Sequence, residues 1–401
     1  MNKNPKGCSN IGGGDAARLE YCRNKALELF SLYGYRPFSP AEFQLIEDVW
    51  NKLAPNRARR LIALTTPFGE PCVLRSDITL SAVAYLDSHY KESERPLRLC
   101  YADRIFSAPR PPKTNLEENQ VGVEVLGWEG AGVEAEVVTL LFRTLDALSI
   151  ESSSVVLGDT SIISKIFEDV PREKAELLTE ALQNSSYMAY RGVMETMELD
   201  DEKRGLLEAL PQLKGGVSLL GEAMRLIGDS SVVMPLKRLC DTLCKLGYEE
   251  RLRVDLGFIR DLGYYKGSVF NVYSSTSGAL LGGGGRYDGL LTKIGIEGQG
   301  AGFAFTLKEL AGHSPERVQA PTLMLWCGAA DQSDALRYAD GLAKKSVTFE
   351  LSWQKDRAES LRIARQRGYL WWIDYSAKKA LSLRGDEEIE LRKFESEALS
   401  C

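Results

Sequence analysis

A glycine-rich stretch between residues 278 and 302 most constrains how this 401-residue chain can fold. Ten glycines interrupt short apolar runs there, four of them consecutive from Gly282 to Gly285. This spacing predicts short antiparallel strands joined by tight turns. The stretch lacks the Gly-Lys-Ser/Thr ending of a phosphate-binding loop. We therefore expect Leu281 to Leu290 to form a structural turn at which the backbone approaches a small ligand.

The region before the glycines has two parts. From Ala16 to Tyr33 apolar residues recur every three or four positions, which predicts an amphipathic helix ended by Gly34. Tyr35 to Pro40 is expected to be extended, because a proline disfavours helical geometry in the residue before it. A helix-rich block at about 161–250 then interrupts two β-rich regions, and we interpret it as a helical insertion.

The C-terminal region follows a different pattern. The segment 312–321 contains His313 and two prolines and is expected to be a linker, which divides the chain into a core domain at 1–316 and a small domain at 318–401. Beyond it, expected strands alternate with helices, and the last strand is placed near Glu388 to Phe394. This alternation predicts a small α/β domain.

Composition excludes several functions. The net charge of −6, from 50 basic and 56 acidic residues, argues against a protein that wraps nucleic acid or coats an anionic membrane. With only His89 and His313, a multi-histidine metal site is impossible. Cys240 and Cys244 lie one helical turn apart, so they belong either to a buried helix face or to half of a metal site. No apolar stretch is long enough for a membrane span, and we expect a cytoplasmic protein with free thiols.

The segment Asn119 to Gly127 is the first candidate for a binding site. It alternates with period two, so a strand would place three valines on one face and Gln120 and Glu124 on the other. The valine face belongs in a core. The opposite face offers hydrogen-bond acceptors for a bound cation such as an α-amino group. The alternative is a solvated polar face with no ligand.

A second candidate segment runs from Arg260 to Phe270. Arg260 suits a planar carboxylate, and Tyr264 and Tyr265 can enclose an aromatic ligand while donating hydrogen bonds. The alternative is that the two tyrosines only pack at the start of a strand.

Taken in order along the chain, these segments resemble the histidine-binding half of class II histidyl-tRNA synthetases. The resemblance rests on Gln120-x-x-x-Glu124, on Arg260 with Tyr264-Tyr265, and on Gly-Gly-Arg-Tyr-Asp-Gly-Leu at 284–290. Residues 74–79 resemble the family's Arg-Pro-Glu-Gly-Thr element, 35–40 its motif 1 strand at the dimer interface, and 302–304 the start of its motif 3. The resemblance covers about residues 9–312, with a fainter echo of the anticodon-binding domain in 319–401.

The resemblance implies an α+β fold: a class II aminoacyl-tRNA synthetase-like antiparallel sheet flanked by helices, with a helical insertion and a small C-terminal α/β domain. It also implies a histidine site. The residues that match the family's histidine contacts are Asp77, Thr79, Gln120, Glu124, Arg260, Tyr264, Tyr265, Arg286 and Tyr287. Asp77 can equally cap the helix that follows it, and Arg286 can equally be structural.

Three departures from the family pattern concern ATP. Phe106-Ser107 stands where the synthetases carry Phe-Arg, the arginine that grips the α-phosphate. The loop that follows is acidified at Glu117 and Glu118, and Glu309 stands where motif 3 has its second ATP arginine. Because a carboxylate repels a triphosphate, activation of an amino acid with ATP is expected to be lost. Arg104 and Arg110 lie close enough in sequence to compensate.

A synthetase fold that keeps its histidine contacts and loses its ATP contacts is similar to the regulatory subunits of ATP phosphoribosyltransferase. That resemblance implies a non-catalytic subunit of the first enzyme of histidine biosynthesis, with no catalytic residues, no metal and no cofactor. The implied partners are a short catalytic subunit, L-histidine and a second copy of this chain, with no nucleic acid and no membrane. Two alternatives stay open: an active histidyl-tRNA synthetase, and a synthetase-like scaffold that binds no histidine.

Overall fold

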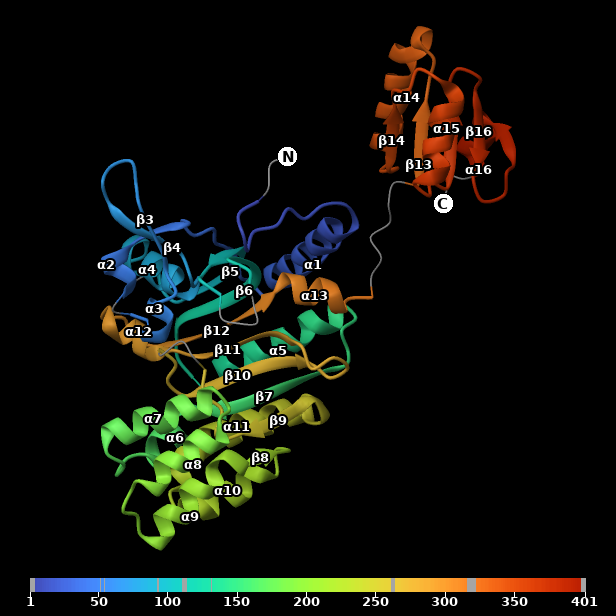
Figure 1. Cartoon of the computed structure of the whole chain (residues 1–401). Coiled ribbons are helices and arrows are strands. Elements are labelled where there is room, and N and C mark those ends of the chain that lie inside the picture. Colours follow the sequence, from blue (N-terminus) through green and yellow to red (C-terminus); the bar gives the residue numbers. More distant parts are fainter. Residues whose placement is uncertain are drawn as a thin grey trace. The chain divides into compact units, whose positions relative to one another are not determined.

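The computed structural model describes residues 4–50, 52–53, 55–91, 94–109, 114–130, 132–260, 264–315 and 322–397. The chain divides into two compact units, Met1–Glu316 and Arg317–Cys401, which are described separately. Figure 1 shows a large sheet with helices in the first unit and a small sheet in the second.

A nine-stranded sheet forms the centre of the first unit. Its strand order is β1-β5-β6-β12-β11-β10-β7-β9-β8, and its pairs are antiparallel except for β1 with β5 and β7 with β9. The strands are β1 (Arg36–Pro37), β5 (Leu97–Phe106), β6 (Glu117–Trp128), β7 (Ser153–Asp159), β8 (Lys214–Gly215), β9 (Leu252–Asp255), β10 (Ser268–Ser274), β11 (Leu280–Arg286) and β12 (Gln299–Thr306). The expected α+β fold with a largely antiparallel sheet is confirmed.

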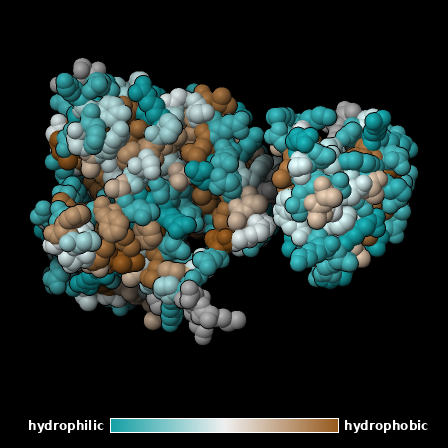
Figure 2. Space-filling model, turned by 90° about the horizontal axis from the view of Figure 1, so that it is seen from above, coloured by the Kyte–Doolittle hydropathy of each residue, from teal (hydrophilic) through white to brown (hydrophobic). Residues whose placement is uncertain are grey.

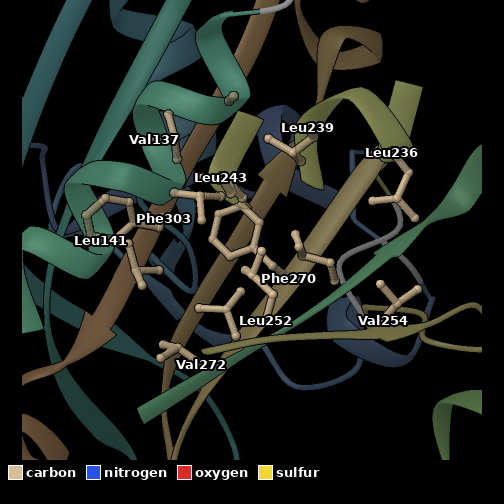
Figure 3. Close-up of a cluster of buried hydrophobic side chains, with 14 of the residues drawn as sticks. Val137, Leu141, Leu236, Leu239, Leu243, Leu252, Val254, Phe270, Val272 and Phe303 are labelled. Atoms are coloured by element: carbon tan, nitrogen blue, oxygen red, sulfur yellow. The ribbon is translucent and has the colours of Figure 1, made fainter. Parts of the chain in front are cut away.

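One face of this sheet carries the main hydrophobic core. The three valines of β6 are fully buried there, as the alternation predicted, against α1 (Gly13–Leu32), α5 (Gly132–Ala147) and α13 (Leu307–His313). Figure 3 shows Val137 and Leu141 of α5 meeting Phe303 of β12 and Phe270 of β10 in this core. Because this face is filled by helices, a ligand can reach only the other one.

The stretch between β7 and β9 is helical, and only the two-residue β8 interrupts it. Its helices are α6 (Thr160–Ile166), α7 (Arg172–Gln183), α8 (Tyr187–Glu195), α9 (Asp201–Ala209), α10 (Leu219–Ile227) and α11 (Ser230–Lys245). Leu236, Leu239 and Leu243 of α11 point into the main core beside α5 (Figure 3). Cys240 is buried on the same helix, which supports the core-face interpretation of that cysteine. The helical insertion is thus anchored to the sheet by apolar burial.

A smaller layer is built from the segment between β1 and β5. A three-stranded sheet in the order β2-β4-β3 is followed by α4, and the second hydrophobic cluster joins this layer to α12. The elements are β2 (Phe43–Leu45), α2 (Ile46–Trp50), α3 (Pro55–Ala58), β3 (Ile62–Thr65), β4 (Pro71–Leu74), α4 (Thr79–His89) and α12 (Asp288–Lys293). This layer brings Arg57 of α3 and the N-terminus of α4 to the open face of the large sheet.

The glycine-rich segment corrects one expectation. Gly282 to Gly285 do not form a turn but lie inside β11, at the centre of the sheet. A Cβ at Gly284 would lie 2.0 Å from the carbonyl oxygen of Gly302 on β12, so only glycine allows the two strands to approach this closely. Strand β11 ends at Arg286, and α12 begins at Asp288 after the single bridging residue Tyr287.

The second unit is a five-stranded sheet in the order β14-β13-β15-β16-β17 with helices packed on it. Its elements are β13 (Leu323–Trp326), α14 (Gln332–Lys344), β14 (Phe349–Ser352), α15 (Arg357–Gln366), β15 (Trp371–Asp374), β16 (Lys379–Ser382), β17 (Glu388–Glu390) and α16 (Leu391–Glu397). The small α/β domain is as expected, with two corrections. Strand β16 was missed, and the expected strand at 388–394 changes into α16 at Leu391, where Leu391 and Phe394 turn together into the core.

Candidate functional site

The open face of the large sheet carries a buried carboxylate at its centre. Glu124 of β6 is only 1% exposed and lies opposite Gly302 of β12. Its carboxylate accepts hydrogen bonds from the Thr79 hydroxyl at 2.7 Å and from the hydroxyls of Tyr101 and Tyr287. A Cβ at residue 302 would stand 2.2 Å from Glu124 Oε2, so the glycine of β12 makes room for this carboxylate.

A second buried carboxylate lies at the start of α4. Asp77 Oδ1 accepts the backbone N–H of Leu80 at 2.9 Å, and Oδ2 accepts the hydroxyl of Tyr264 at 2.8 Å. Asp77 therefore caps the helix and lines the pocket at the same time, so its capping role does not exclude a contact to a ligand.

Burial shifts the titration of both carboxyl groups. Loss of water raises the pKa of Glu124 to about 8, against the lowering effect of the Tyr287 and Thr79 hydroxyls, and the charge of Asp77 adds to the rise. Burial also raises the pKa of Asp77, while its hydrogen bonds with Leu80 and Tyr264 and the nearby charges of Arg57 and Arg260 oppose that rise. Each carboxylate would be stabilised by a cation placed between them.

Three tyrosines form an aromatic wall beside these carboxylates. The ring centroids of Tyr264 and Tyr265 lie 5.0 Å apart, and Tyr287 stands edge-on to Tyr264 at 6.1 Å. Two of the hydroxyls are committed to Asp77 and Glu124. The tyrosines thus hold the carboxylates of Asp77 and Glu124 in place and present their ring surfaces to a ligand.

Arg260 supplies a cation at the opposite end of the pocket. Its Nη1 donates to the carbonyl oxygen of Phe270 at 2.9 Å and to Asn271 Oδ1 at 2.6 Å, and its guanidinium lies 5.5 Å from the centre of the Tyr265 ring. A Cβ on Gly283 would meet Nη1 at 1.9 Å, so this glycine of β11 makes the arginine's position possible. The pocket thus combines two buried carboxylates with the cations of Arg57 and Arg260.

Eight of the nine predicted residues line one inner pocket. They are Asp77, Thr79, Gln120, Glu124, Arg260, Tyr264, Tyr265 and Tyr287. The pocket leaves about 70 Å³ for the centres of water molecules. Since one water needs roughly 10–15 Å³ measured this way, there is room for roughly five waters, which suits a ligand of amino-acid size.

The ninth residue, Arg286, is placed differently. Its Nε donates to Asp288 Oδ2 at 2.7 Å and its Nη1 to Glu134 Oε2 at 3.4 Å, and it is not among the residues that line the pocket. Its geometry is that of a structural ion-pair residue immediately before Tyr287.

Sequence reasoning missed several lining residues, of which Arg57 and Tyr101 carry polar groups into the pocket. Tyr101 lies on β5 opposite Gly122, and the alternation of β5 was the signal that could have indicated it. Arg57 comes from the short helix α3, and nothing in its local sequence links it to Glu124. His89 and His313 are engaged elsewhere, with Ser88 and with Ser277, and neither lines the pocket.

The positions that differ from the synthetase pattern lie at the β5–β6 hairpin and on α13. The hydroxyl of Ser107 accepts a hydrogen bond from Arg60 Nη2 at 3.2 Å. Arg104 is engaged by Asn119 Oδ1 at 3.2 Å and by Glu117 at 3.4 Å. Arg110, the other cation considered, lies outside the described residues, as does the loop segment 110–113.

Two features are absent from the part of the chain that the structure describes. Over these ranges no group of three or more His, Cys, Asp or Glu side chains could hold a metal ion. Among the described helices, none is both long and apolar enough to cross a membrane.

Comparison with known proteins identifies the family. The family model described as histidyl-tRNA synthetase matches residues 7–310, about three quarters of the chain. The chain belongs to the histidyl-tRNA synthetase family. The resemblance derived from the motifs is thereby confirmed.

Within this family, curated relatives carry a more specific name. The ATP phosphoribosyltransferase regulatory subunit of Moorella thermoacetica is 28% identical over 378 residues, covering 92% of this chain and 97% of the relative. The protein of the same name from Bacillus subtilis is 29% identical over 294 residues, covering 72% of this chain and 75% of the relative. The expected similarity to these subunits is likewise confirmed.

Solved structures agree on the fold. A Bacillus halodurans structure titled as an ATP phosphoribosyltransferase regulatory subunit/histidyl-tRNA synthetase superposes with a TM-score of 0.84 at 22% identity, covering 93% of this chain and 97% of that one. The histidyl-tRNA synthetase from Nostoc gives 0.82 at 16% identity and covers 100% and 99%. Because both of these solved structures share the fold of this chain, the fold does not distinguish a regulatory subunit from a synthetase.

Proposed function

We propose that this member of the histidyl-tRNA synthetase family is a non-catalytic regulatory subunit of ATP phosphoribosyltransferase that binds L-histidine in the inner pocket. The observation that carries the proposal is a contrast between two sets of positions. Eight of the nine residues that match the family's amino-acid contacts line a common pocket, whereas the two positions that match its ATP arginines hold Ser107 and Glu309.

The polarity of the inner pocket supports histidine as its ligand. An α-ammonium group placed between Asp77 and Glu124 would satisfy two carboxylates whose charges burial disfavours. The ligand carboxylate would then face Arg260, and the imidazole ring would lie against the tyrosine wall with its N–H directed to an acceptor such as Gln120.

The other end of the sheet face argues against ATP binding. Glu118 accepts hydrogen bonds from Thr306 and Gln120 on the open face, whereas Arg104 pairs with Glu117 on the opposite face of the strands. A triphosphate entering here would meet carboxylates instead of arginines. Losing one charge-assisted contact typically costs about 1.5–3 kcal/mol before repulsion is added.

The proposed partner follows from the names of the relatives. Proteins called regulatory subunits of ATP phosphoribosyltransferase align with nearly the whole chain, so we propose that this chain assembles with a short catalytic subunit of that enzyme.

We also propose a homodimer, formed through the region around β1. Large apolar side chains are exposed on the neighbouring elements, among them Leu32, Phe43 and Trp50, and Figure 2 shows hydrophobic patches on one face of the larger unit. Burying such a surface against a second copy would be favourable.

Reconstitution tests the proposal. The purified chain is mixed with the short phosphoribosyltransferase of the same organism, and formation of phosphoribosyl-ATP is followed with and without L-histidine. We expect the catalytic subunit to be inactive alone and active in the mixture, with histidine lowering the rate. Activity that is indifferent to this chain would overturn the proposed function.

A second measurement addresses the alternatives. Calorimetry on the isolated chain should give heat with L-histidine and none with ATP. ATP-dependent formation of histidyl-adenylate would identify an active synthetase instead. Absence of any histidine binding, together with activation of the partner, would identify a scaffold.

A further inference from the structure

A second, larger cavity adjoins the inner pocket on the same sheet face. This outer groove has a volume of about 620 Å³ and lies between the sheet and the helical insertion, where Tyr187 of α8 and Leu182 of α7 form its outer side. None of the motifs that indicated the histidine site lies in it, apart from Arg260.

The two cavities are continuous across the sheet. Gly283 of β11, on the floor of the inner pocket, pairs in register with Asn271 of β10, and Asn271 pairs with Val156 of β7. Asn271 and Val156 both line the outer groove. The floor of one cavity therefore continues into the floor of the next, one strand at a time.

Arg57 and Arg260 stand at the boundary, because each lines both cavities. The guanidinium of Arg260 is held between the ring of Tyr265 on the inner side and the amide oxygen of Asn271 on the outer side. The buried carboxylates Asp77 and Glu124 line only the inner pocket. An amino acid bound with its ammonium group on these carboxylates therefore points its carboxyl group toward the outer groove.

We propose that the site accepts histidine compounds extended at the carboxyl group by an amide bond, such as an N-terminal histidyl dipeptide, with the second residue in the outer groove. The proposal rests on the proposed histidine site and names a wider ligand class for it. In such a ligand the amide carbonyl oxygen takes the place of the carboxylate oxygen at Arg260. In the groove, Leu182, Phe258 and Leu280 can contact an apolar second residue, and Gln183 and Ser186 are within it to bond a peptide group.

Calorimetry on the full chain with three ligands tests this directly. L-Histidine, L-histidyl-L-leucine and L-leucyl-L-histidine are compared; the last carries the same two side chains, but the α-nitrogen of its histidine is in a peptide bond and uncharged. We expect histidyl-leucine to bind within tenfold of histidine, and leucyl-histidine to bind at least 50-fold more weakly than histidyl-leucine.

A variant locates the second residue. Leu280→Trp places a larger side chain in the outer groove without touching the inner pocket, and Leu336→Trp, at a leucine of similar exposure (47% against 44%) in the other unit, is the matched control. We expect Leu280→Trp to weaken histidyl-leucine binding at least tenfold and histidine binding less than twofold. Leu336→Trp should change neither.

The outcomes separate the two proposals. If histidine binds and histidyl-leucine does not, the extended ligand class is wrong while the proposed function stands. If Leu280→Trp weakens the binding of histidine and histidyl-leucine equally, or weakens the binding of neither, the assignment of the groove is overturned. If histidine itself does not bind, the histidine site fails, and with it this inference.

Discussion

The inner pocket and the β5–β6 hairpin end share strand β6, yet their charged groups are paired in opposite ways. At the pocket, Glu124 and Asp77 are buried and held by hydroxyls and a backbone N–H. At the hairpin end, Arg104 is more than half exposed and is paired with Glu117. This difference supports the proposal that the pocket receives a cation, whereas the charges at the hairpin end pair with each other.

The largest effect is expected from removing the Glu124 carboxylate from the pocket. Glu124→Ala should weaken L-histidine binding at least 100-fold, because a buried charge-assisted contact is lost and the hydroxyls of Thr79 and Tyr287 lose their acceptor. Glu117→Ala, on the same strand at the hairpin end, is the control and should change the affinity less than twofold. Calorimetry on both variants checks this, and similar losses in both would remove the contrast between the two ends.

The raised pKa of Glu124 predicts a pH dependence of binding. With a pKa of about 8, roughly a tenth of the Glu124 carboxyls are ionised at pH 7 and half at pH 8. Since the ligand ammonium needs the ionised form, histidine binding should strengthen about fivefold from pH 7 to pH 8 and release protons. Titrations in buffers of different ionisation enthalpy measure that release, which Glu124→Gln should abolish.

The same pKa has a consequence for the unliganded fold. The folded pKa lies above the ordinary value of 4.5, so between these two values the folded chain keeps a proton that the unfolded chain has lost. The free energy of unfolding should therefore fall as pH rises from about 5 to 8, and less steeply in Glu124→Gln. Urea denaturation at the two pH values measures it; a rise with pH confined to the unmodified chain would contradict the shift.

A smaller effect is expected at Arg286. Its ion pairs with Asp288 and Glu134 hold the backbone just before Tyr287, so Arg286→Ala should weaken histidine binding only about threefold through Tyr287, and lower stability by about 1 kcal/mol. Arg286→Lys should restore part of both. A 100-fold loss of affinity in Arg286→Ala, with stability unchanged, would instead make Arg286 a ligand contact, as the motif had suggested.

The smallest effect on histidine is expected from restoring the family's arginines. The double variant Ser107→Arg with Glu309→Arg acts only at the ATP end, so histidine affinity should stay within twofold. ATP binding, measured by the same calorimetry, should become stronger than in the unmodified chain, because two cations replace a hydroxyl and a carboxylate. Loss of histidine binding in this variant would show that the two ends are coupled.

Much of the site could be read from local sequence because period-two alternation fixes which side chains share a strand face. The valines of β6 entered the core and Glu124 the open face, as predicted. Arg57 could not be found this way, since α3 is connected to the pocket only through the packing of the small sheet layer. The outer groove also had no local signal, because its lining comes from the helices of the insertion and from five strands, β7 to β11.

The sequence by itself determined the family, the sheet with its helical insertion, and which residue types face a ligand, since these depend on motifs and on local periodicity. Only the tertiary structure showed that Gly283 of β11 makes room for Arg260 and that Gly302 of β12 makes room for Glu124. A Cβ at either glycine would clash with a side chain from a distant segment of the chain. The tertiary structure also separated Arg286 from the pocket, since ion pairs with Glu134 and Asp288 hold its side chain elsewhere. These arrangements depend on contacts between distant segments of the chain, so no local sequence pattern predicts them.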